Sequence, residues 1–390
     1  MKLALVAPVV LEEGGRDDSD LLLVLAKALT LQGFDVEIFT TTAIGERTYE
    51  PFYRPGRTRR SDFTINRYNT QEPKEYRSFQ LLTRWLFSGL YSRRDEGIWL
   101  RQAGPVVPAM VRHLLEREEE FDLFLLFGVT GFNNFELLRK LSKPKVLFIG
   151  DHSLELLNLR TFREALAQSR GLVFFGESRK ALYGRLYPEL MGKVPFMVTP
   201  PLTPSLPVLR RSRRFARKHA IPGPYILYRG SLEEEGVTRA IKYFFYLHKR
   251  HGLDLSLVLL GRRGIPLIEA EWIKVVEETS EVDEALSGAM VTLHPSLEDP
   301  FGYRLLGSLG SGRGCLVDGR NELYRERLVR SGAGFFYSGF FDFERVVLDL
   351  LRKPDRAFRA GCKGRKLYRE KYDQEILLPG IVDFLQKAVV

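Results

Sequence analysis

The stretch VTLHPSLEDPFGYRLLGSLGSGRGCLV, residues 291–317, decides the fold class. It begins with an apolar run and continues through a Pro-Ser turn, an acidic pair and a short helical pattern. A glycine-rich stop and a second apolar run close it. The apolar runs predict two buried strands, Val291–His294 and Cys315–Val317. Strand, helix and strand in this order form one parallel βαβ unit, which indicates an α/β fold.

The loop of this unit carries candidate ligand-binding groups. In a parallel sheet, the loop after a strand's carboxyl end faces the ligand crevice. The amides of Phe301 and Gly302 open the predicted helix, where free N–H donors bind an anion or a sugar hydroxyl. Glu298 and Asp299 are adjacent, so their side chains point in different directions and do not share a proton. An ordinary capped helix of an α/β domain has the same pattern, and that interpretation stays open.

Length and composition indicate a globular protein of two or three domains. The chain has 390 residues, of which 44% are hydrophobic, and a net charge of +10. It lacks an apolar run of about 18 residues and a signal-peptide pattern, and it has two cysteines, Cys315 and Cys362. We therefore expect a cytoplasmic protein without disulfides or a metal site. The positive charge favours an anionic partner, although an ordinary basic surface explains it equally well.

The first half of the chain predicts one open α/β domain, residues 1–200. Gly14 and Gly15 lie in the first loop, where glycine allows close approach of the backbone to a ligand or forms a merely flexible turn. A dinucleotide-binding G-x-G-x-x-G pattern is absent there. The expected elements are strand Lys2–Val10, helix Asp20–Gln32 and strands Phe34–Thr41, Phe121–Phe127, Lys145–Ile149 and Gly171–Phe175.

A proline-rich and basic segment, residues 201–224, predicts a linker to a second α/β domain, residues 225–365. Residues 366–390 are expected to be mostly helical, with a break at Pro379-Gly380. In the second domain we expect strands Tyr225–Tyr228, Leu255–Leu260 and Lys274–Glu277, and a helix at 236–251. The expected fold is therefore α/β, with two doubly wound Rossmann-like domains facing each other across a cleft. The C-terminal helix is expected to return to the first domain.

Several segments resemble the family-4 glycosyltransferases, which are retaining enzymes of the GT-B architecture. MKLALVAPVV…GG…LAKALTLQGFDVEIFT is similar to the family's opening strand, glycine loop, helix and strand. GDHS at 150–153 is similar to its T-x-H segment, and PYILYRGSLEEEGV at 224–237 to a strand followed by G-R-x-x-x-x-K-G. LSLVLLGRRG at 255–264 matches a strand ending in G-x-G, and HPSLEDPFGYRLLGSLGSG at 294–312 matches P-S-x-x-E-x-F-G-x-x-x-x-E-A-x-A-x-G. The tail GRKLYREKYDQEILLPGIVDFL resembles the closing helices.

The resemblance implies a hexosyltransferase of glycan biosynthesis. Such an enzyme moves a sugar from a nucleotide-sugar donor to a glycan or lipid-linked acceptor, with retention and without a metal or other cofactor. His152 would lie near the reacting carbon, although a hydrogen-bonded turn explains this histidine equally well, and Asp299 and Glu298 would hold sugar hydroxyls. The implied donor-binding residues are Gly14, Gly15, Gly230, Ser231, Arg229, Arg262, Arg263, Phe301, Gly302 and Arg304.

The departures from the family pattern concern the donor site. Ser231 stands where the diphosphate-binding Arg is expected, Glu235 where a Lys is expected, and Gly307 where a second Glu grips the ribose. The first acidic position holds the shorter Asp299. Each charged hydrogen bond to a ligand contributes on the order of 1.5–3 kcal/mol. Compensating cations are Arg262 and Arg263 after a strand and Arg304 in the first turn of a helix, whereas Arg229 points to the opposite face of its strand from the family Arg.

These departures leave two rival interpretations open. The first is a catalytically silent relative, a scaffold or accessory subunit that keeps the fold and has lost the donor site. The second is a two-domain small-molecule binding protein that closes around its ligand without chemistry. Binding of nucleoside diphosphates argues against the first rival, and sugar transfer from mixed donors argues against the second.

Residues 47–101 form a basic and aromatic segment with twelve Arg or Lys against six acids. Positive charge interleaved with aromatic rings is typical of a surface that contacts an anionic membrane. The protein would then be peripheral at the cytoplasmic membrane face. A long surface insertion with a partly packed helix explains the segment as well. Nucleic-acid binding is not expected, because the sequence contains no recognised module for it.

Overall fold

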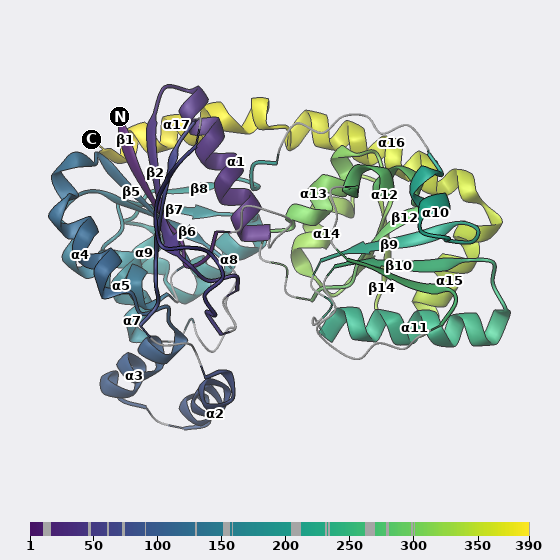
Figure 1. Ribbon diagram of the computed structural model, residues 1–390, viewed down its shortest axis with the longest axis horizontal. Coiled ribbons are helices and arrows are strands. Elements are labelled where there is room, and N and C mark those ends of the chain that lie inside the picture. The colour runs from purple at the N-terminus through teal and green to yellow at the C-terminus, as the bar shows by residue number, and fades with distance from the viewer. Residues whose placement is uncertain are drawn as a thin grey trace. The chain divides into compact units, whose positions relative to one another are not determined.

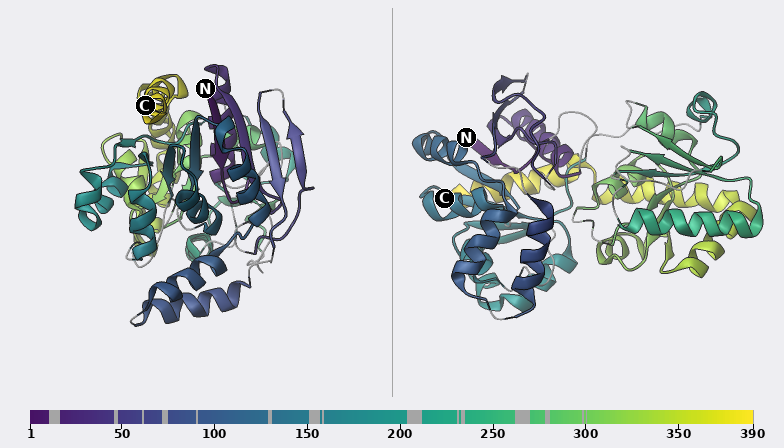
Figure 2. Two further views of the ribbon diagram at one scale, coloured as in Figure 1. Left: turned by 90° about the vertical axis from the view of Figure 1, so that its left-hand side faces the viewer. Right: turned by 60° about the horizontal axis from the view of Figure 1, so that its bottom comes forward.

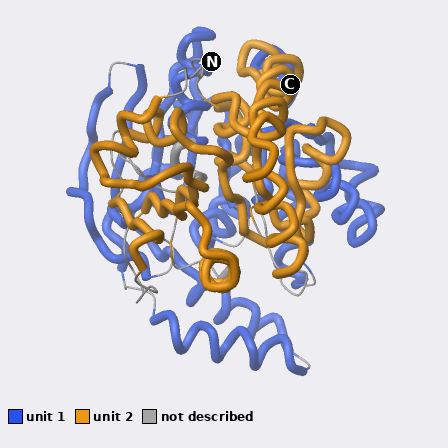
Figure 3. The backbone as a smooth tube through the Cα atoms, turned by 90° about the vertical axis from the view of Figure 1, so that its right-hand side faces the viewer, with its two compact units in different colours: residues 1–200, 378–390 blue, residues 201–377 orange. Residues whose placement is uncertain are grey.

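The computed structural model describes residues 1–389 apart from gaps, and the chain folds into two compact units. Unit 1 comprises residues 1–200 and 378–390, and unit 2 comprises residues 201–377 (Figure 3). The side chains of residues 17–20 and 235 are also outside the description. The gaps are residues 11–16, 46–47, 61, 72–74, 90, 129–130, 151–156, 158, 204–211, 231, 233–234, 262–269, 278–280, 298 and 300.

The described part of unit 1 contains an eight-stranded sheet with the order β3-β4-β2-β1-β5-β6-β7-β8. All neighbouring strands are parallel except β3 and β4, which are antiparallel. The strands are β1 Lys2–Val6, β2 Asp35–Thr41, β3 Gly56–Arg59, β4 Thr64–Tyr68, β5 Leu123–Phe127, β6 Lys145–Ile149, β7 Gly171–Phe174 and β8 Phe196–Val198. The helices are α1 Asp17–Leu31, α2 Tyr76–Phe87, α3 Arg93–Ala103, α4 Pro108–Glu116, the short 3₁₀ helix η1 Glu118–Glu120, α5 Phe132–Lys140, α7 Arg160–Ala167, α8 Glu177–Leu186 and α9 Pro188–Met191.

The described part of unit 2 contains a six-stranded parallel sheet with the order β11-β10-β9-β12-β13-β14. Its strands are β9 Tyr225–Arg229, β10 Ser256–Leu260, β11 Ile273–Val276, β12 Val291–His294, β13 Cys315–Asp318 and β14 Gly334–Tyr337. Its helices are α10 Arg214–Lys218, α11 Glu235–His251, α12 Val282–Gly288, α13 Tyr303–Gly310, α14 Glu322–Leu328, α15 Phe340–Arg352 and α16 Pro354–Lys371. The last helix, α17 Gln374–Val389, begins in unit 2 and ends in unit 1.

The central strands of the unit 2 sheet bury both of their faces, as the continuous apolar runs predict (Figure 1). Leu257 and Leu259 of β10 pack with residues of α11 and α15 on one face. Val258 and Leu260, one residue out of phase, pack with residues of α10 and α12 on the other face. Helices therefore cover both faces of the sheet. The expected doubly wound α/β arrangement is confirmed for this unit.

Most element boundaries lie within three residues of the sequence-based expectation, but two differences are larger. The first strand ends at Val6, whereas the apolar run predicts an end at Val10. The expected helix break at Pro379 is wrong, because α17 runs through this residue. A proline here removes only the one hydrogen bond that its nitrogen would donate to the carbonyl of Glu375. The helical tail is instead interrupted between α16 and α17, at Tyr372 and Asp373.

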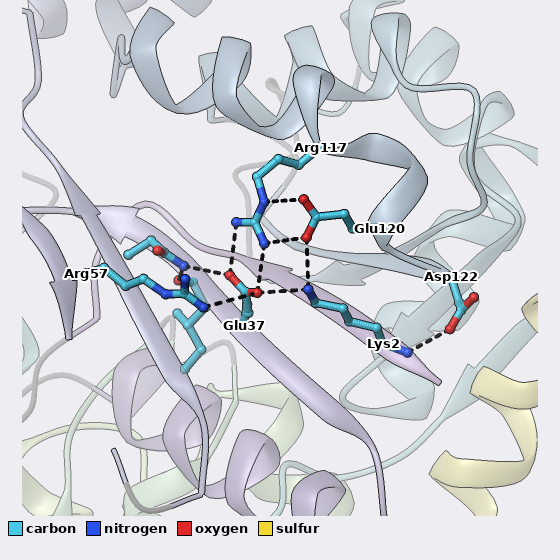
Figure 4. A network of polar contacts seen from close by, with 8 residues as sticks. Lys2, Glu37, Arg57, Arg117, Glu120 and Asp122 are labelled. Carbon is cyan, nitrogen blue, oxygen red and sulfur yellow. Dashed lines mark hydrogen bonds and ion pairs between the residues drawn. The ribbon is translucent and has the colours of Figure 1, made fainter. Parts of the chain in front are cut away.

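The amino edge of the unit 1 sheet holds a network of charged residues around Glu37 of β2 (Figure 4). Arg117 donates to both carboxylate oxygens of Glu37, at 3.1 and 2.9 Å, and also to Glu120. Lys2 Nζ lies 3.1 Å from Glu37 and 3.0 Å from Glu120. Burial raises the pKa of Glu37, but the hydrogen bonds from Arg117 and Lys2 outweigh this effect and lower it to about 2. The buried carboxylate is thus charged and satisfied.

The basic and aromatic segment 47–101 folds into strands β3 and β4 and the paired helices α2 and α3, which lie side by side (Figure 2). Trp99 of α3 is buried between the helices, in contact with the rings of Phe79 and Phe87. Glu96, also buried, accepts hydrogen bonds from the amides of Arg160 and Thr161 at the start of α7. The inner sides of these helices are therefore part of the unit 1 core.

Candidate functional site

The order of the strands in unit 2 defines a topological switch point between β9 and β12. From β9 the chain adds β10 and β11 on one side, and from β12 it adds β13 and β14 on the other. The two central strands are parallel neighbours, so their carboxyl ends meet at one edge of the sheet. In open α/β sheets, ligands bind at this edge where the strand order reverses. A ligand-binding site is therefore expected at the loops after Arg229 and His294.

Glycines let the backbone segments at this edge approach one another closely. Gly230 directly follows β9 and has a φ of +141°, a backbone conformation that residues other than glycine rarely adopt. A Cβ at Gly236, in the first turn of α11, would lie 2.1 Å from the carbonyl oxygen of Pro295. A Cβ at Gly261 would lie 2.2 Å from the carbonyl oxygen of Gly230. The start of α11 thus lies against the end of β12, across the switch point.

The loop before α13 is organised by Asp299, which is 4% exposed. Its Oδ1 accepts hydrogen bonds from the amides of Phe301, at 3.1 Å, and Gly302, at 2.7 Å. Its Oδ2 accepts one from the hydroxyl of Tyr324, at 2.9 Å. Arg327 donates to the carbonyl of Phe301, at 2.7 Å. The two amides are engaged within the protein, which corrects the expectation of free N–H donors at this helix start.

Arg304 reaches from the first turn of α13 to the end of β9. Its Nη1 donates to the hydroxyl of Tyr228, at 3.1 Å, and to the carbonyl of Arg229, at 2.9 Å. A Cβ at Gly230 would lie only 1.4 Å from the same nitrogen. The guanidinium group therefore occupies the space that the missing side chain of Gly230 leaves. One cation bridges the two strands of the switch point.

His294 ends β12 and is fully buried beside this group. Its Nε2 lies 3.0 Å from the hydroxyl oxygen of Thr292. Burial and, to a smaller extent, the positive charge of Arg304 lower the pKa of His294 to about 3. The imidazole is therefore neutral at neutral pH and contributes no positive charge to the site.

The structure brings part of the sequence-predicted site together. Gly230, Asp299, Phe301, Gly302 and Arg304 gather around the switch point, and Arg229 contributes its carbonyl. Their roles toward a ligand stay predictions. The remaining predicted residues lie outside the described residues, namely Gly14, Gly15, His152, Ser231, Arg262, Arg263 and Glu298.

Sequence reasoning missed four residues that build the site: Tyr228, Gly236, Tyr324 and Arg327. The sequence contains a signal for Tyr228, because its spacing of two residues from Gly230 places both on the same side of the chain at the end of β9. The last two hold a loop about 25 residues earlier in the chain, through contacts with Asp299 and Phe301. Sequence spacing carries no signal for such contacts.

The corresponding edge of unit 1 lies at β1 and β5, where that sheet reverses its order. The buried Arg67 donates to the carbonyl of Thr41, at 3.2 Å, and to that of Val10, at 2.9 Å. Its guanidinium carbon also lies 4.0 Å from the ring centre of Tyr53. Burial lowers the pKa of Arg67 to about 10, so the side chain stays charged at neutral pH. It anchors Val10, four residues beyond the end of β1.

Metal-binding clusters and membrane-spanning helices are both absent from the described residues. Among these residues, no group of three or more His, Cys, Asp or Glu side chains is placed to hold a metal ion. None of the described helices is both long and apolar enough to cross a membrane.

The fold is similar to that of several solved structures. Sucrose-phosphate synthase from Thermosynechococcus elongatus superposes with a TM-score of 0.72 at 14% identity, covering 99% of this chain and 98% of that one. WaaG, a glycosyltransferase involved in lipopolysaccharide biosynthesis, gives 0.65 at 15% identity over 98% and 99% of the two chains. HepE from Anabaena, in complex with UDP and glucose, gives 0.68 at 10% identity over 99% and 100%. No family model matches the sequence, and no curated protein is similar to it in sequence.

These likenesses extend over the whole chain, and at this level of identity they show the fold. The chain has the GT-B fold of glycosyltransferases, with two parallel-sheet α/β domains. The expected fold class is confirmed, whereas the assignment to family 4 within this architecture stays a prediction.

Proposed function

We propose that the chain is a retaining hexosyltransferase whose nucleotide-sugar donor binds at the carboxyl edge of β9 and β12 in unit 2. The observation that carries this proposal is the switch point itself, where glycines let the backbone segments approach one another closely and Arg304 supplies a positive charge. The fold likeness to a protein solved in complex with UDP and glucose supports a nucleotide-sugar donor. The acceptor is a glycan or a lipid-linked sugar, bound by unit 1.

The proposed reaction exchanges one bond at the anomeric carbon of the sugar. The bond to the diphosphate oxygen breaks, and the nucleoside diphosphate leaves with the electron pair. A bond to the acceptor hydroxyl oxygen forms on the same face, and the hydroxyl proton passes to the departing diphosphate. Positive charge near the diphosphate stabilises the leaving group as negative charge develops, so the proposal requires no metal.

The predicted site residues take distinct roles in this proposal. His152 lies near the reacting carbon, and Glu298 holds sugar hydroxyls. Ser231, Arg262 and Arg263 contact the diphosphate from the loops after β9 and β10. Asp299 accepts three hydrogen bonds within the protein, so we assign it a positioning role, holding the loop that leads into α13.

A two-stage experiment tests the proposal. Thermal unfolding is first measured with UDP, GDP, ADP and CDP, because a ligand at a hundred times its Kd stabilises a protein by about 2.7 kcal/mol. Nucleotide-sugar donors are then added together with glycan and lipid extracts. These donors carry the base of the nucleotide that stabilises the protein, and their sugars are labelled with tritium. Stabilisation and label transfer support the proposal. Stabilisation without transfer from any donor favours the two-domain binding protein without chemistry. The absence of stabilisation by all four nucleotides contradicts a donor site and favours the catalytically silent relative.

We also propose that unit 1 contacts an anionic membrane surface, at its cytoplasmic face, through the outer side of α2. Leu81 and Trp85, four residues apart, are 66% and 57% exposed on this side. The exposed Arg77 and Arg84 lie on the same helix. Exposed apolar residues beside basic ones are complementary to acyl chains and acidic headgroups, and each basic residue contributes about 1 kcal/mol near such a surface.

Vesicle co-sedimentation tests this membrane contact. We expect binding to vesicles with acidic headgroups, weaker binding at high salt and little binding to neutral phosphatidylcholine vesicles. The double variant L81S/W85S should lose most of the binding. F341S is the matched control, because Phe341 is also a highly exposed apolar residue but lies in unit 2. Equal losses in both variants, or unchanged binding of L81S/W85S, would contradict the proposal.

A further inference from the structure

We infer that Arg304 also binds the diphosphate of the nucleotide, reaching the phosphates across the switch point from α13. This inference rests on the proposed function. Ser231 and Glu235, which follow β9 in the sequence, supply no positive charge to a diphosphate. The positive charge comes instead from Arg304 on α13, the helix that follows β12.

The position of the guanidinium group is the first argument. Arg304 belongs to α13, which follows β12, but its Nη1 lies 2.9 Å from the carbonyl oxygen of Arg229 at the end of β9. The edge between these two strands is where a ligand of this sheet is expected. The side chain is half-buried and is anchored at the end of β9 by these contacts.

The residues around Arg304 leave room for its side chain and hold it in place. Gly230 leaves room for Nη1, which a Cβ at that position would meet at 1.4 Å. The hydroxyl of Tyr228, on the same strand face as Gly230, accepts a hydrogen bond from Nη1 at 3.1 Å. A guanidinium group has five N–H donors in a planar fork, whose geometry matches phosphate oxygens.

The other groups at the same edge of the sheet are either engaged within the protein or neutral. The amides of Phe301 and Gly302 donate to Asp299, so this helix start is engaged within the protein. His294 is buried and hydrogen-bonded to Thr292. Neither group provides a cation for a diphosphate. The charge of Arg304 is therefore the feature of the described switch point that suits an anionic ligand.

Calorimetric titration of variants tests the inference. UDP, GDP, ADP and CDP are titrated into the wild-type protein, and each nucleotide that binds is compared with its nucleoside. We expect R304Q to weaken diphosphate binding about tenfold or more and to leave nucleoside binding unchanged, because the lost contact is a charged hydrogen bond to phosphate. R304K keeps the positive charge but lacks the forked guanidinium group, so its diphosphate affinity should lie between those of the wild type and R304Q. Higher salt should weaken wild-type binding more than binding by R304Q.

Two control variants separate phosphate binding from a purely structural role. R320Q removes a positive charge from the same unit. Arg320 follows β13 and pairs with Asp318, the last residue of that strand. This variant should leave the affinities for the nucleoside diphosphate and for the nucleoside unchanged. Y228F removes one anchor of Arg304 but keeps its charge, so it should lower diphosphate affinity by less than about threefold. If R304Q binds the diphosphate as tightly as the wild type, Arg304 is only structural and the donor site survives. If the wild type binds none of the four nucleotides, the proposed function fails together with the inference.

Discussion

Gly230 is the residue at which the absence of a side chain matters most. Its φ of +141° and the 1.4 Å distance from a built Cβ to Nη1 of Arg304 both exclude an ordinary residue. Its place after an apolar strand was predictable from sequence, as was its shared face with Tyr228. The neighbour that fills its space was not, because Arg304 lies on another βαβ unit about 74 residues later and only the folded sheet brings the two together.

A pair of glycine substitutions tests this account. G230A should lower the free energy of unfolding by about 1–3 kcal/mol, because alanine disfavours the positive φ and displaces Arg304. G307A is the matched control. Gly307 lies inside α13, and a Cβ there meets nothing within 4 Å, so alanine should stabilise the protein by up to about 1 kcal/mol. Urea denaturation of both variants checks the opposite signs, and equal effects would contradict the assigned geometry.

Asp299 shows the limit of prediction at the same scale. The sequence identifies it as an acidic residue before a helix, next to a ligand-facing edge. In the structure, its buried carboxylate accepts hydrogen bonds from the hydroxyl of Tyr324 and from two backbone amides. Which partner a carboxylate selects depends on the packing of α14 against this loop, and local sequence does not encode that packing.

At the level of the elements, the central strands were predictable because parallel strands buried on both faces are continuous apolar runs. Lys145–Ile149 and Val291–His294 match the expectation residue for residue. The expectation omitted the edge strand β3 and its neighbour β4, since GRTR and TINRY carry charges and polar residues. Edge strands tolerate such residues because solvent covers part of their surface. Pattern reading therefore recovers the centre of a sheet better than its rim.

The Glu37 network gives a prediction for strand β2 and its surroundings. The pKa of Glu37 is lowered from 4.5 to about 2, so the stabilisation is present above pH 4.5 and is lost as pH falls toward 2. This contributes about 3 kcal/mol of pH-dependent stability. Urea denaturation between pH 7 and 2.5 should show a steeper acid loss for the wild type than for E37Q.

The network lies at the amino edge of the unit 1 sheet, away from the carboxyl ends of its parallel strands. E37Q should therefore change stability and leave nucleotide binding unchanged. E119Q is the matched control, since the exposed Glu119 pairs at the surface with Lys143 and should change stability by less than about 1 kcal/mol. Identical acid profiles of the wild type and E37Q would contradict the role assigned to Glu37.

At the level of the whole molecule, the alternation of strands and helices in both halves predicts two doubly wound units. The structure and its likeness to GT-B glycosyltransferases confirm this fold class. The activity cannot be obtained in the same way, because one fold supports many sites and function depends on the residues at the ligand edge. The family resemblance predicts departures from the donor-site pattern at Ser231, Glu235 and Gly307, so the proposed donor site rests on the geometry of the described residues.

Hydrogen–deuterium exchange, measured with and without the nucleoside diphosphate that gives the largest thermal shift, tests the central claim most directly. The account predicts slower exchange in peptides spanning residues 225–236 and 294–306 of unit 2. Peptides that cover Glu37 and Arg117 at the amino edge of unit 1 should exchange at unchanged rates. Slower exchange confined to other parts of the chain, with both unit 2 segments unaffected, would contradict a donor site at this switch point.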